Sequence, residues 1–264
     1  MSKALKDIPV VILAGGNGTR VGTGKIIPKP MVEIDDVPLL QYIMDYFSGY
    51  GFYKFIIAMG RYSDTISDYF NKYYRSRNPG ENDTVTRYLG SGNKNRSHWE
   101  IIDVQTGIED NTGSRISKIA DLLIKYPYFI LTYGDVVANV NLNELHEFHL
   151  SHKKIATVTA VHYPTRFRIL GLYGDDNEVR GFADKPVLQK DYISGGFYIL
   201  NKGVLQMKSL TQDASCSFER HVLEELVQKK ELQAFRFGGY WQSLDTERDL
   251  EIIRQYIKNI RLYA

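Results

Sequence analysis

The sequence has little cysteine and little excess charge. Its single cysteine, Cys216, excludes an intramolecular disulfide and any zinc site built from several cysteines. Lysine and arginine number 33 against 31 aspartates and glutamates, a formal net charge of +2. The two signs are interspersed along the chain, so we expect neither a nucleic-acid groove nor a membrane-binding face.

Long hydrophobic runs are also missing. The apolar stretch at 8–14 is too short to span a membrane, and no plausible signal-peptide cleavage site accompanies it. We therefore expect a soluble, cytoplasmic protein. No internal repeat, low-complexity tract or linker divides the 264 residues, which predicts one domain, 1–264.

Helical and strand patterns alternate along the chain. Apolar residues at 40, 43, 44 and 47 have helical spacing, and the run at 55–59 has the character of a buried strand. Further helices are predicted near 66–73, 116–123, 142–149, 217–229 and 246–262, and further strands at 128–133, 156–162, 172–182, 192–200 and 232–237, with an exposed excursion at 76–97. The alternation predicts an α/β fold with a doubly wound, mostly parallel sheet.

The most informative segment is V-V-I-L-A-G-G-N-G-T-R at 10–20, followed nine residues later by Lys29 between two prolines. Glycines after a buried strand leave backbone N–H groups free for a ligand, and cations beyond them suit a triphosphate. A Walker A loop is excluded, because five residues separate Gly18 from Gly24 and Lys25 is followed by Ile26. The glycine spacing also fails the Rossmann fingerprint.

Two aspartates are candidate metal ligands. Asp135 follows an apolar strand and a glycine, and Asp245 precedes a predicted helix. Carboxylates combined with substrate phosphates commonly hold Mg²⁺. Each has an ordinary alternative, a turn aspartate for Asp135 and a helix-start acid for Asp245, just as Lys29 has the alternative of a solvated surface lysine.

One predicted helix carries three histidines, His146, His149 and His152, which could suggest a zinc site. His146 and His149 come one residue short of the H-E-x-x-H zinc pattern, so we assign them no metal.

Taken together, these segments resemble the sugar-1-phosphate nucleotidyltransferase family over nearly the whole chain. The matching segments are LAGGNGTR (13–20), PKPMVEI (28–34), TYGD (132–135), FHLSHKK (148–154), DKP (184–186), SGGFYIL (194–200) and YWQSLDT (240–246). The resemblance implies the nucleotide-diphospho-sugar transferase type of Rossmann-like fold, a mostly parallel mixed sheet with a small β-rich sugar-binding part. Residues 1–140 would form the nucleotide-binding half and 141–264 the sugar-phosphate-binding half.

The resemblance also implies a reaction with CTP as the nucleotide, in which CTP and a sugar 1-phosphate give a CDP-sugar and pyrophosphate with Mg²⁺. TYGD and WQSLDT favour this cytidylyl branch. Arg20, Lys29 and Asp135 would be catalytic, and Asp135 and Asp245 would hold Mg²⁺. Nucleotide contacts would come from Leu13, Ala14, Gly15, Gly16, Gly18, Thr19, Arg20, Lys29, Thr112 and Arg115, and sugar-phosphate contacts from Asp184, Lys185, Ser194 and Gly195.

Some positions depart from the family pattern. Asp184 stands where a glutamate is usual, Ser194 where an asparagine is usual, and Val136 where a glycine is usual. Ile27 replaces a lysine in a loop about one residue shorter. Because Asp184 and Ser194 fall at expected sugar positions, the acceptor is glucose 1-phosphate or a variant sugar phosphate.

Three alternatives stay open: the same chemistry with UTP or dTTP, a non-catalytic nucleotide-sugar-binding homologue, and a Rossmann oxidoreductase. The family resemblance further implies a homo-oligomer. Tyrosines around 62–74 would cover a subunit interface or pack in the core.

Overall fold

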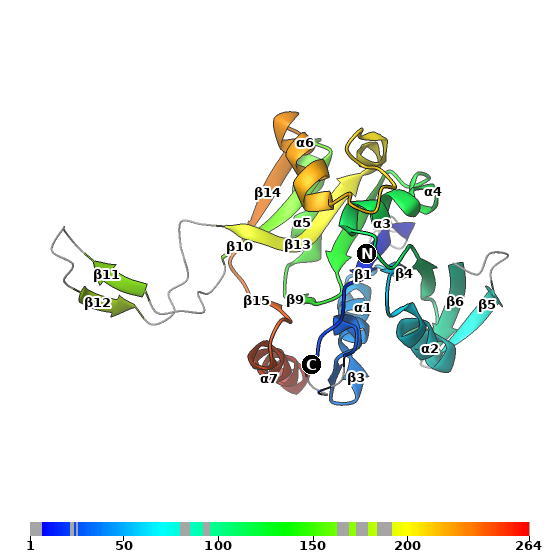
Figure 1. The fold of residues 1–264 in the computed structure, drawn as a ribbon, viewed down its shortest axis with the longest axis horizontal. Helices are drawn as coiled ribbons and strands as arrows, with labels where there is room; N and C mark the ends of the chain where they lie inside the picture. The colour runs from blue at the N-terminus through cyan, green and yellow to red at the C-terminus, as the bar shows by residue number, and fades with distance from the viewer. Residues whose placement is uncertain are drawn as a thin grey trace.

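The fold is built around one nine-stranded sheet with helices on both faces (Figure 1). The structure is a computed structural model that describes residues 7–21, 24, 26–79, 85–91, 96–162, 169–172, 179–183 and 192–263. The strand order in the sheet is β14-β10-β13-β8-β1-β4-β7-β6-β5. Strands β8, β1, β4 and β7 are mutually parallel, whereas β13 and the β5–β6 pair run antiparallel to their neighbours.

The strands of the main sheet are β1 (Pro9–Ala14), β4 (Lys54–Met59), β5 (Tyr74–Pro79), β6 (Val85–Ser91), β7 (Glu100–Gln105), β8 (Tyr128–Tyr133), β10 (Ala156–Val161), β13 (Ile193–Asn201) and β14 (Leu232–Phe237). Smaller two-stranded sheets are formed by β2 (Glu33–Ile34) with β3 (Val37–Pro38), β9 (Val136–Ala138) with β15 (Trp241–Ser243), and β11 (Ile169–Leu172) with β12 (Val179–Ala183).

The helices are α1 (Leu39–Gly49), α2 (Ser63–Tyr73), α3 (Thr112–Lys118), α4 (Ala120–Leu123), α5 (Leu142–His152), α6 (Leu223–Gln228) and α7 (Glu247–Tyr263). Short 3₁₀ segments occur at η2 (Lys29–Met31) and η4 (Lys202–Gln206), and η5 (Phe218–Val222) is a π-helix. Within the described residues, no helix has the length and apolar character needed to cross a membrane.

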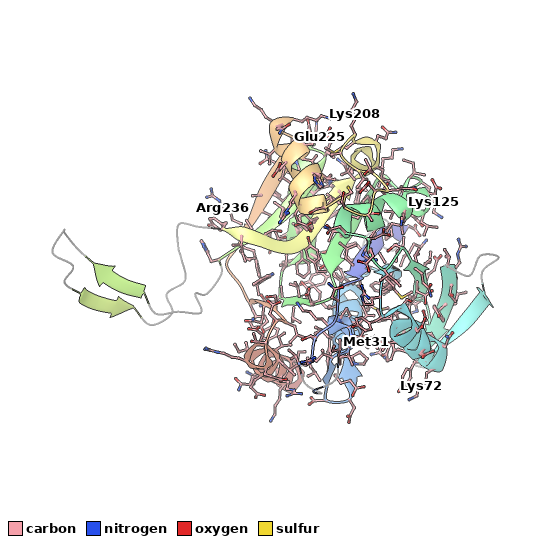
Figure 2. The ribbon with its side chains drawn as sticks, viewed as in Figure 1. Met31, Lys72, Lys125, Lys208, Glu225 and Arg236 are labelled. Atoms are coloured by element: carbon pink, nitrogen blue, oxygen red, sulfur yellow. The ribbon has the colours of Figure 1, made fainter. Side chains whose placement is uncertain are left out.

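Strand β1 separates two hydrophobic cores, which is why its sequence is apolar throughout. Val10 and Ile12 face one core with α1, α2 and α7, whereas Val11 and Leu13 face the other with α3 and α6. Every residue of β1 is buried. Burial on both faces is typical of a parallel strand covered by helices on each side, so the predicted doubly wound α/β fold is confirmed. Figure 2 shows side chains filling the space between the sheet and its helices, with the exposed Lys72, Lys125 and Lys208 at the periphery.

The predicted excursion at 76–97 is wrong in part, because β5 and β6 extend the sheet there and β7 follows as an unpredicted strand. Strand β7 carries Asp103 in its centre, an unusual residue for a buried strand. Its carboxylate accepts hydrogen bonds from Ser67 Oγ at 2.7 Å and Tyr88 OH at 3.1 Å, and from the backbone N–H of Thr86 at 3.1 Å. Partners distant in the sequence therefore compensate the burial of Asp103, and local pattern cannot show them.

A capping box opens α7. The Asp249 carboxylate accepts the Thr246 N–H at 2.8 Å, and the Thr246 hydroxyl accepts the Asp249 N–H at 3.3 Å. The strand expected at 172–182 corresponds to the β11–β12 hairpin, which lies apart from the main sheet in Figure 1.

Tyrosines at the end of α2 and the start of β5 differ in their burial. Tyr69 and Tyr74 both donate to Gln41 inside the core, at 3.0 and 2.6 Å, whereas Tyr73 is half exposed. Core packing therefore accounts for Tyr69 and Tyr74.

Candidate active site

A cavity of about 560 Å³ opens at the carboxyl ends of β1, β7 and β8. The sheet reverses its winding at β1, because the chain moves from β1 to β4 on one side and later returns to β8 on the other. Open α/β sheets bind ligands at such a position. The lining residues are Leu13, Ala14, Gly15, Gly16, Asn17, Gly18, Pro28, Lys29, Pro30, Ile108, Glu109, Asp110, Asn111, Thr112, Arg115, Tyr133, Gly134 and Asp135.

The glycine-rich loop after β1 is closed by a backbone bridge. Thr19 and Ile27 exchange two hydrogen bonds, at 2.7 Å from Thr19 N and 2.9 Å from Ile27 N. Gly18 has φ +80°, and a Cβ there would approach the Ile27 carbonyl oxygen to 2.8 Å. Glycine is thus required at this position for the loop to fold back beside the cavity. Thr19 and the exposed Arg20 follow in the loop but are outside the set of lining residues.

The Pro-Lys-Pro segment is positioned by its second proline. Pro30 is buried and contacts Gly134, where a Cβ would come within 2.6 Å of the proline ring. Gly134 in turn donates its N–H to the Leu13 carbonyl at 3.0 Å, which joins the ends of β8 and β1. The segment is stiff because proline fixes its backbone φ angle. Lys29 is therefore delivered to the start of the turn that carries Asp135.

Asp245 reaches the same place through the small β9–β15 ladder. Ser243 pairs with Val136 in that ladder, and the Leu244 N–H donates to the Asp135 carbonyl at 2.8 Å. The buried Asp249 carboxylate accepts the Asp245 N–H at 3.2 Å and so fixes the corner before α7. A strand pair thus holds two aspartates together that are 110 positions apart in the sequence.

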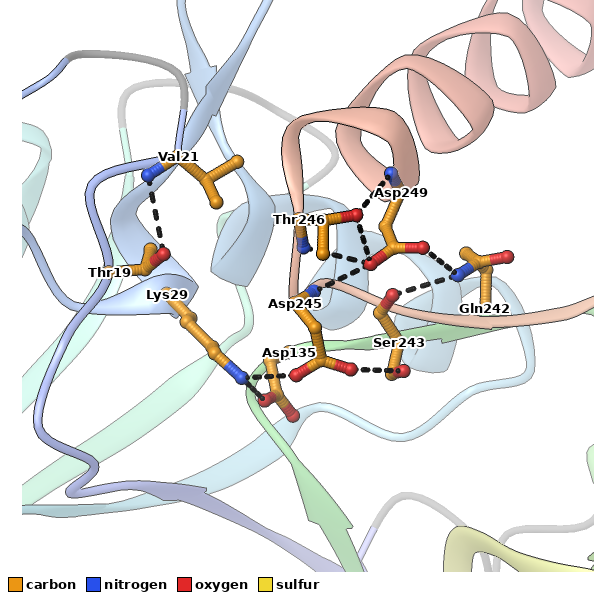
Figure 3. A network of polar contacts seen from close by, with 9 residues as sticks. All are labelled: Thr19, Val21, Lys29, Asp135, Gln242, Ser243, Asp245, Thr246 and Asp249. Atoms are coloured by element: carbon orange, nitrogen blue, oxygen red, sulfur yellow. Dashed lines mark hydrogen bonds and ion pairs between the residues drawn. The ribbon is translucent and has the colours of Figure 1, made fainter. Parts of the chain in front are cut away.

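Lys29 lies between the two carboxylates (Figure 3). Its Nζ is 3.1 Å from Asp135 Oδ2 and 2.8 Å from Asp245 Oδ1. Burial raises the pKa of Asp135, and the adjacent Lys29 ammonium opposes that rise. For Lys29, burial acts to lower the pKa, but the two carboxylates outweigh it and the pKa is raised. The cluster therefore places the Lys29 ammonium between two carboxylates beside the cavity.

The donor set suits a hard divalent cation. Both carboxylates already face one shared positive charge, and oxygen ligands from one or two carboxylates plus substrate phosphates are what Mg²⁺ takes. Across the described ranges, no group of three or more histidine, cysteine, aspartate or glutamate side chains is placed to hold a metal. A metal held here would depend on the substrate for its remaining ligands.

Arg115 is turned toward backbone carbonyls. Its guanidinium donates to Met59 O at 2.7 Å, to Gly107 O at 2.9 Å and to Gly15 O at 3.0 Å, and to the Thr106 hydroxyl at 2.6 Å. Burial lowers the pKa of Arg115, while Asp110 opposes that effect. A Cβ on Gly15 would lie 2.1 Å from Arg115 Cζ, so this glycine is needed for the close approach. Arg115 therefore ties the ends of β1, β4 and β7 together beneath the cavity.

The residues expected at the sugar phosphate are only partly described. Asp184 and Lys185 lie outside the described residues. Ser194 Oγ is 2.6 Å from Tyr198 OH, and the Gly195 carbonyl accepts the Trp241 indole N–H at 2.7 Å. Neither Ser194 nor Gly195 is among the residues that line the cavity.

The sequence pattern did not indicate several of the residues that line the cavity. The loop 108–111 follows β7, and because that strand was not predicted, no strand-end loop was expected there. Within this loop Glu109 Oε1 is 2.6 Å from Arg61 Nη2, an exposed ion pair. Tyr133 and Gly134 belong to the TYGD segment, whose presence beside Asp135 was the available signal.

Known proteins resemble this chain in sequence and in fold. A family model described as "Nucleotidyl transferase" matches residues 9–258. The glucose-1-phosphate cytidylyltransferase of Salmonella typhi is 37% identical over 240 residues, which cover 90% of this chain and 91% of that protein. The probable glucose-1-phosphate cytidylyltransferase of Bacillus subtilis is 33% identical, covering 91% of this chain and 92% of the relative. The crystal structure of HddC from Yersinia pseudotuberculosis superposes with a TM-score of 0.65 at 22% identity, over 95% of this chain and 99% of that one.

Proposed function

The chain belongs to the nucleotidyl transferase family, and from that membership we propose that it transfers the cytidylyl group of CTP to a sugar 1-phosphate, releasing pyrophosphate. The observation that carries the proposal is Lys29, held by Asp135 and Asp245 at a cavity walled by the glycine-rich loop. The identity to proteins named glucose-1-phosphate cytidylyltransferase supports CTP as the nucleotide.

In this reaction a phosphate oxygen of the sugar 1-phosphate attacks the α-phosphorus of CTP in line. The bond between the α-phosphorus and the bridging oxygen breaks, and pyrophosphate leaves with that electron pair. The protein forms no covalent intermediate in this scheme. Its contribution is therefore to position the two phosphates and to neutralise their charge.

Lys29 acts on the α-phosphate in this proposal. An ammonium group has three N–H donors, and two of them are directed at Asp135 and Asp245. One donor is left for a phosphate oxygen. Gly18, Thr19 and Arg20 hold the β- and γ-phosphates, with the bridged loop keeping its backbone in place.

Asp135 and Asp245 hold Mg²⁺ in this proposal. When bound, the metal supplies charge neutralisation to the phosphates and makes pyrophosphate a better leaving group. Lys29 is hydrogen-bonded to one oxygen of each carboxylate, so the same two side chains that hold the lysine would also hold the metal.

Around the nucleotide, Leu13 to Gly16 contact base and ribose through their backbone, and Thr112 and Arg115 complete the wall. Arg115 contributes by holding the Gly15 carbonyl. The acceptor contacts proposed for Asp184, Lys185, Ser194 and Gly195 stay predictions. So do the single-domain organisation with its nucleotide and sugar-phosphate halves, the cytoplasmic location and the homo-oligomeric state.

The test is pyrophosphate release by the purified protein with Mg²⁺, across CTP, UTP, dTTP and GTP combined with several sugar 1-phosphates. We expect release with CTP and at least one sugar phosphate. Preference for another nucleotide would mean that the protein uses that nucleotide in place of CTP. No release from any combination, by protein shown to be folded, would overturn it in favour of a non-catalytic homologue.

A further inference from the structure

The loop that leads into α3 is held by a segment that comes about a hundred residues later in the sequence. Residues 212–219, here called the docking segment, lie against residues 111–115. The Asn111 N–H donates to the Ala214 carbonyl at 2.8 Å, and the Ser114 N–H donates to the Cys216 carbonyl at 3.1 Å. Gly113 completes the contact, since a Cβ there would lie 2.6 Å from Cys216 Sγ. The wall of the cavity at Thr112 is therefore built on a separate part of the chain.

Glu219, the last residue of the docking segment, accepts hydrogen bonds from three hydroxyl groups. Its carboxylate accepts from Thr112 Oγ1 at 2.6 Å and from Ser217 Oγ at 2.8 Å, and it also accepts from the Tyr133 hydroxyl. Glu219 lies in the π-helix η5, a form of helix frequent at functional sites. The side chain is not among the residues that line the cavity.

The hydroxyl groups around Glu219 donate hydrogen bonds, so the side chain between them must accept. The Thr112 hydroxyl already accepts the Phe218 N–H at 2.9 Å, and the Ser217 hydroxyl accepts the Arg220 N–H at 3.2 Å. Each hydroxyl proton is therefore free to point at Glu219. Only an ionised carboxylate, which accepts without donating, satisfies three donors at once. Burial opposes the charge, but the hydrogen bonds outweigh it and lower the pKa of Glu219.

Two of the three hydroxyls belong to residues that line the cavity. Thr112 opens α3 on the proposed nucleotide side, and Tyr133 stands two positions before Asp135. The Tyr133 ring meets the Tyr198 ring edge-on, with centroids 6.3 Å apart, and the Tyr198 hydroxyl is hydrogen-bonded to Ser194. Ser194 is an expected sugar contact. Glu219 thus joins two parts of the cavity wall, Thr112 and Tyr133.

We propose that Glu219 is a positioning residue for the transfer reaction: by accepting hydrogen bonds from Thr112 and Tyr133, it fixes the cavity wall on the nucleotide side at Thr112 and on the sugar-phosphate side at Tyr133. This inference rests on the proposed function for its two substrates. Because one carboxylate holds both walls, its loss affects binding of both partners rather than of one.

The test compares Glu219→Gln with wild type and with Glu224→Gln, a matched change at an exposed glutamate of α6. Glutamine keeps the shape but turns an N–H₂ group toward hydroxyl donors. We expect KM for CTP and KM for the sugar 1-phosphate each to rise about tenfold, with kcat changed far less, and Glu224→Gln to match wild type. Two KM values within twofold of wild type, whether or not Tm falls, would overturn the proposal.

Two further variants test the nucleotide side and the sugar-phosphate side of the cavity separately. Thr112→Val is expected to raise KM for CTP alone, and Tyr133→Phe to raise KM for the sugar phosphate alone. If Glu219→Gln does not fold, these two variants decide the matter, and unchanged KM values in both would overturn the proposal.

Direct measurement of CTP binding distinguishes failure of the proposed function from failure of the positioning role of Glu219. If wild type binds CTP by calorimetry but turns over no sugar phosphate, the proposed function fails, and a CTP Kd about tenfold weaker in Glu219→Gln still supports the positioning role. Equal Kd values would overturn it, as would wild type that binds no nucleotide.

Discussion

The acid pair around Lys29 and the histidines of α5 differ in what surrounds them. In one, Lys29 joins Asp135 and Asp245 at the edge of a cavity, with about a quarter or more of each side chain exposed. In the other, three histidines of α5 share hydrogen bonds with neutral partners of the fold. His149 contacts Thr157 Oγ1 at 2.8 Å and Asn201 Oδ1 at 3.1 Å, His152 contacts Thr157 Oγ1 at 2.7 Å, and His146 contacts Tyr128 OH at 2.6 Å.

The histidines have the more motif-like spacing in the sequence, yet the acid pair has the geometry of a site. Neutral partners satisfy the ring nitrogens of His149 on both sides inside the core. Lys29 is instead held by charges, and a phosphate or a divalent cation can compete for the same atoms. We conclude that a polar cluster can serve as a binding or catalytic site when a ligand can replace the hydrogen bonds and ion pairs among its own side chains. The following changes test this difference, from the largest expected effect to the smallest.

Asp135→Asn should have the largest effect. It removes one of two negative charges at the proposed metal position and leaves Asp245 as the remaining charged partner of Lys29. We expect pyrophosphate release to fall about 1,000-fold, equivalent to ~4 kcal/mol in activation free energy. Mn²⁺ binding, followed by electron paramagnetic resonance in the presence of CTP, should weaken in parallel. Activity within tenfold of wild type would remove Asp135 from the proposed machinery.

Lys29→Met should come next, with a loss of about 100-fold in kcat/KM, because one positive charge leaves the α-phosphate. The two carboxylates stay, so Mn²⁺ binding with CTP should persist, unlike in Asp135→Asn. Lys202→Met, at an exposed lysine outside the cavity, is the matched control. If both lysine variants keep full activity, Lys29 has only a structural role.

The sequence predicted the parts of this comparison that depend on local pattern. Apolar periodicity placed β1, α1, β4 and β8, and a strand followed by Gly134-Asp135 marked the carboxyl edge of the sheet. The contacts that assemble the site are not local. Pro30 on Gly134, the β9–β15 ladder and the Glu219 hydrogen bonds each join positions about a hundred residues apart, so no window of sequence contains both partners.

The histidine cluster should act on stability rather than on chemistry. Burial lowers the pKa of His149 to about 4 from its ordinary 6.5, while the hydrogen bond that the His149 ring donates to Asn201 Oδ1 opposes the shift. The unfolded chain therefore takes up this proton first as pH falls. Stability associated with His149 is complete above about pH 6.5, is lost as pH falls toward about 4, and changes no further below that.

Denaturant unfolding between pH 7 and pH 4 measures this loss, which we expect to reach roughly 2–3 kcal/mol for His149. Comparison with His149→Gln isolates the contribution, because the variant lacks the titrating ring but shares every other group. Parallel curves of unfolding free energy against pH for the two proteins would mean that His149 is not held neutral by the fold.

His146→Gln should have the smallest effect. The ring is partly buried and contacts Tyr128 OH, so its replacement removes one hydrogen bond, a loss of about 0.5–1 kcal/mol in unfolding free energy. Pyrophosphate release should stay within twofold of wild type, since α5 contributes no residue to the cavity lining among the residues that the structure describes. A tenfold fall in activity with normal Tm would instead mean that the histidine cluster communicates with the acid pair, and the separation between the two clusters would not hold.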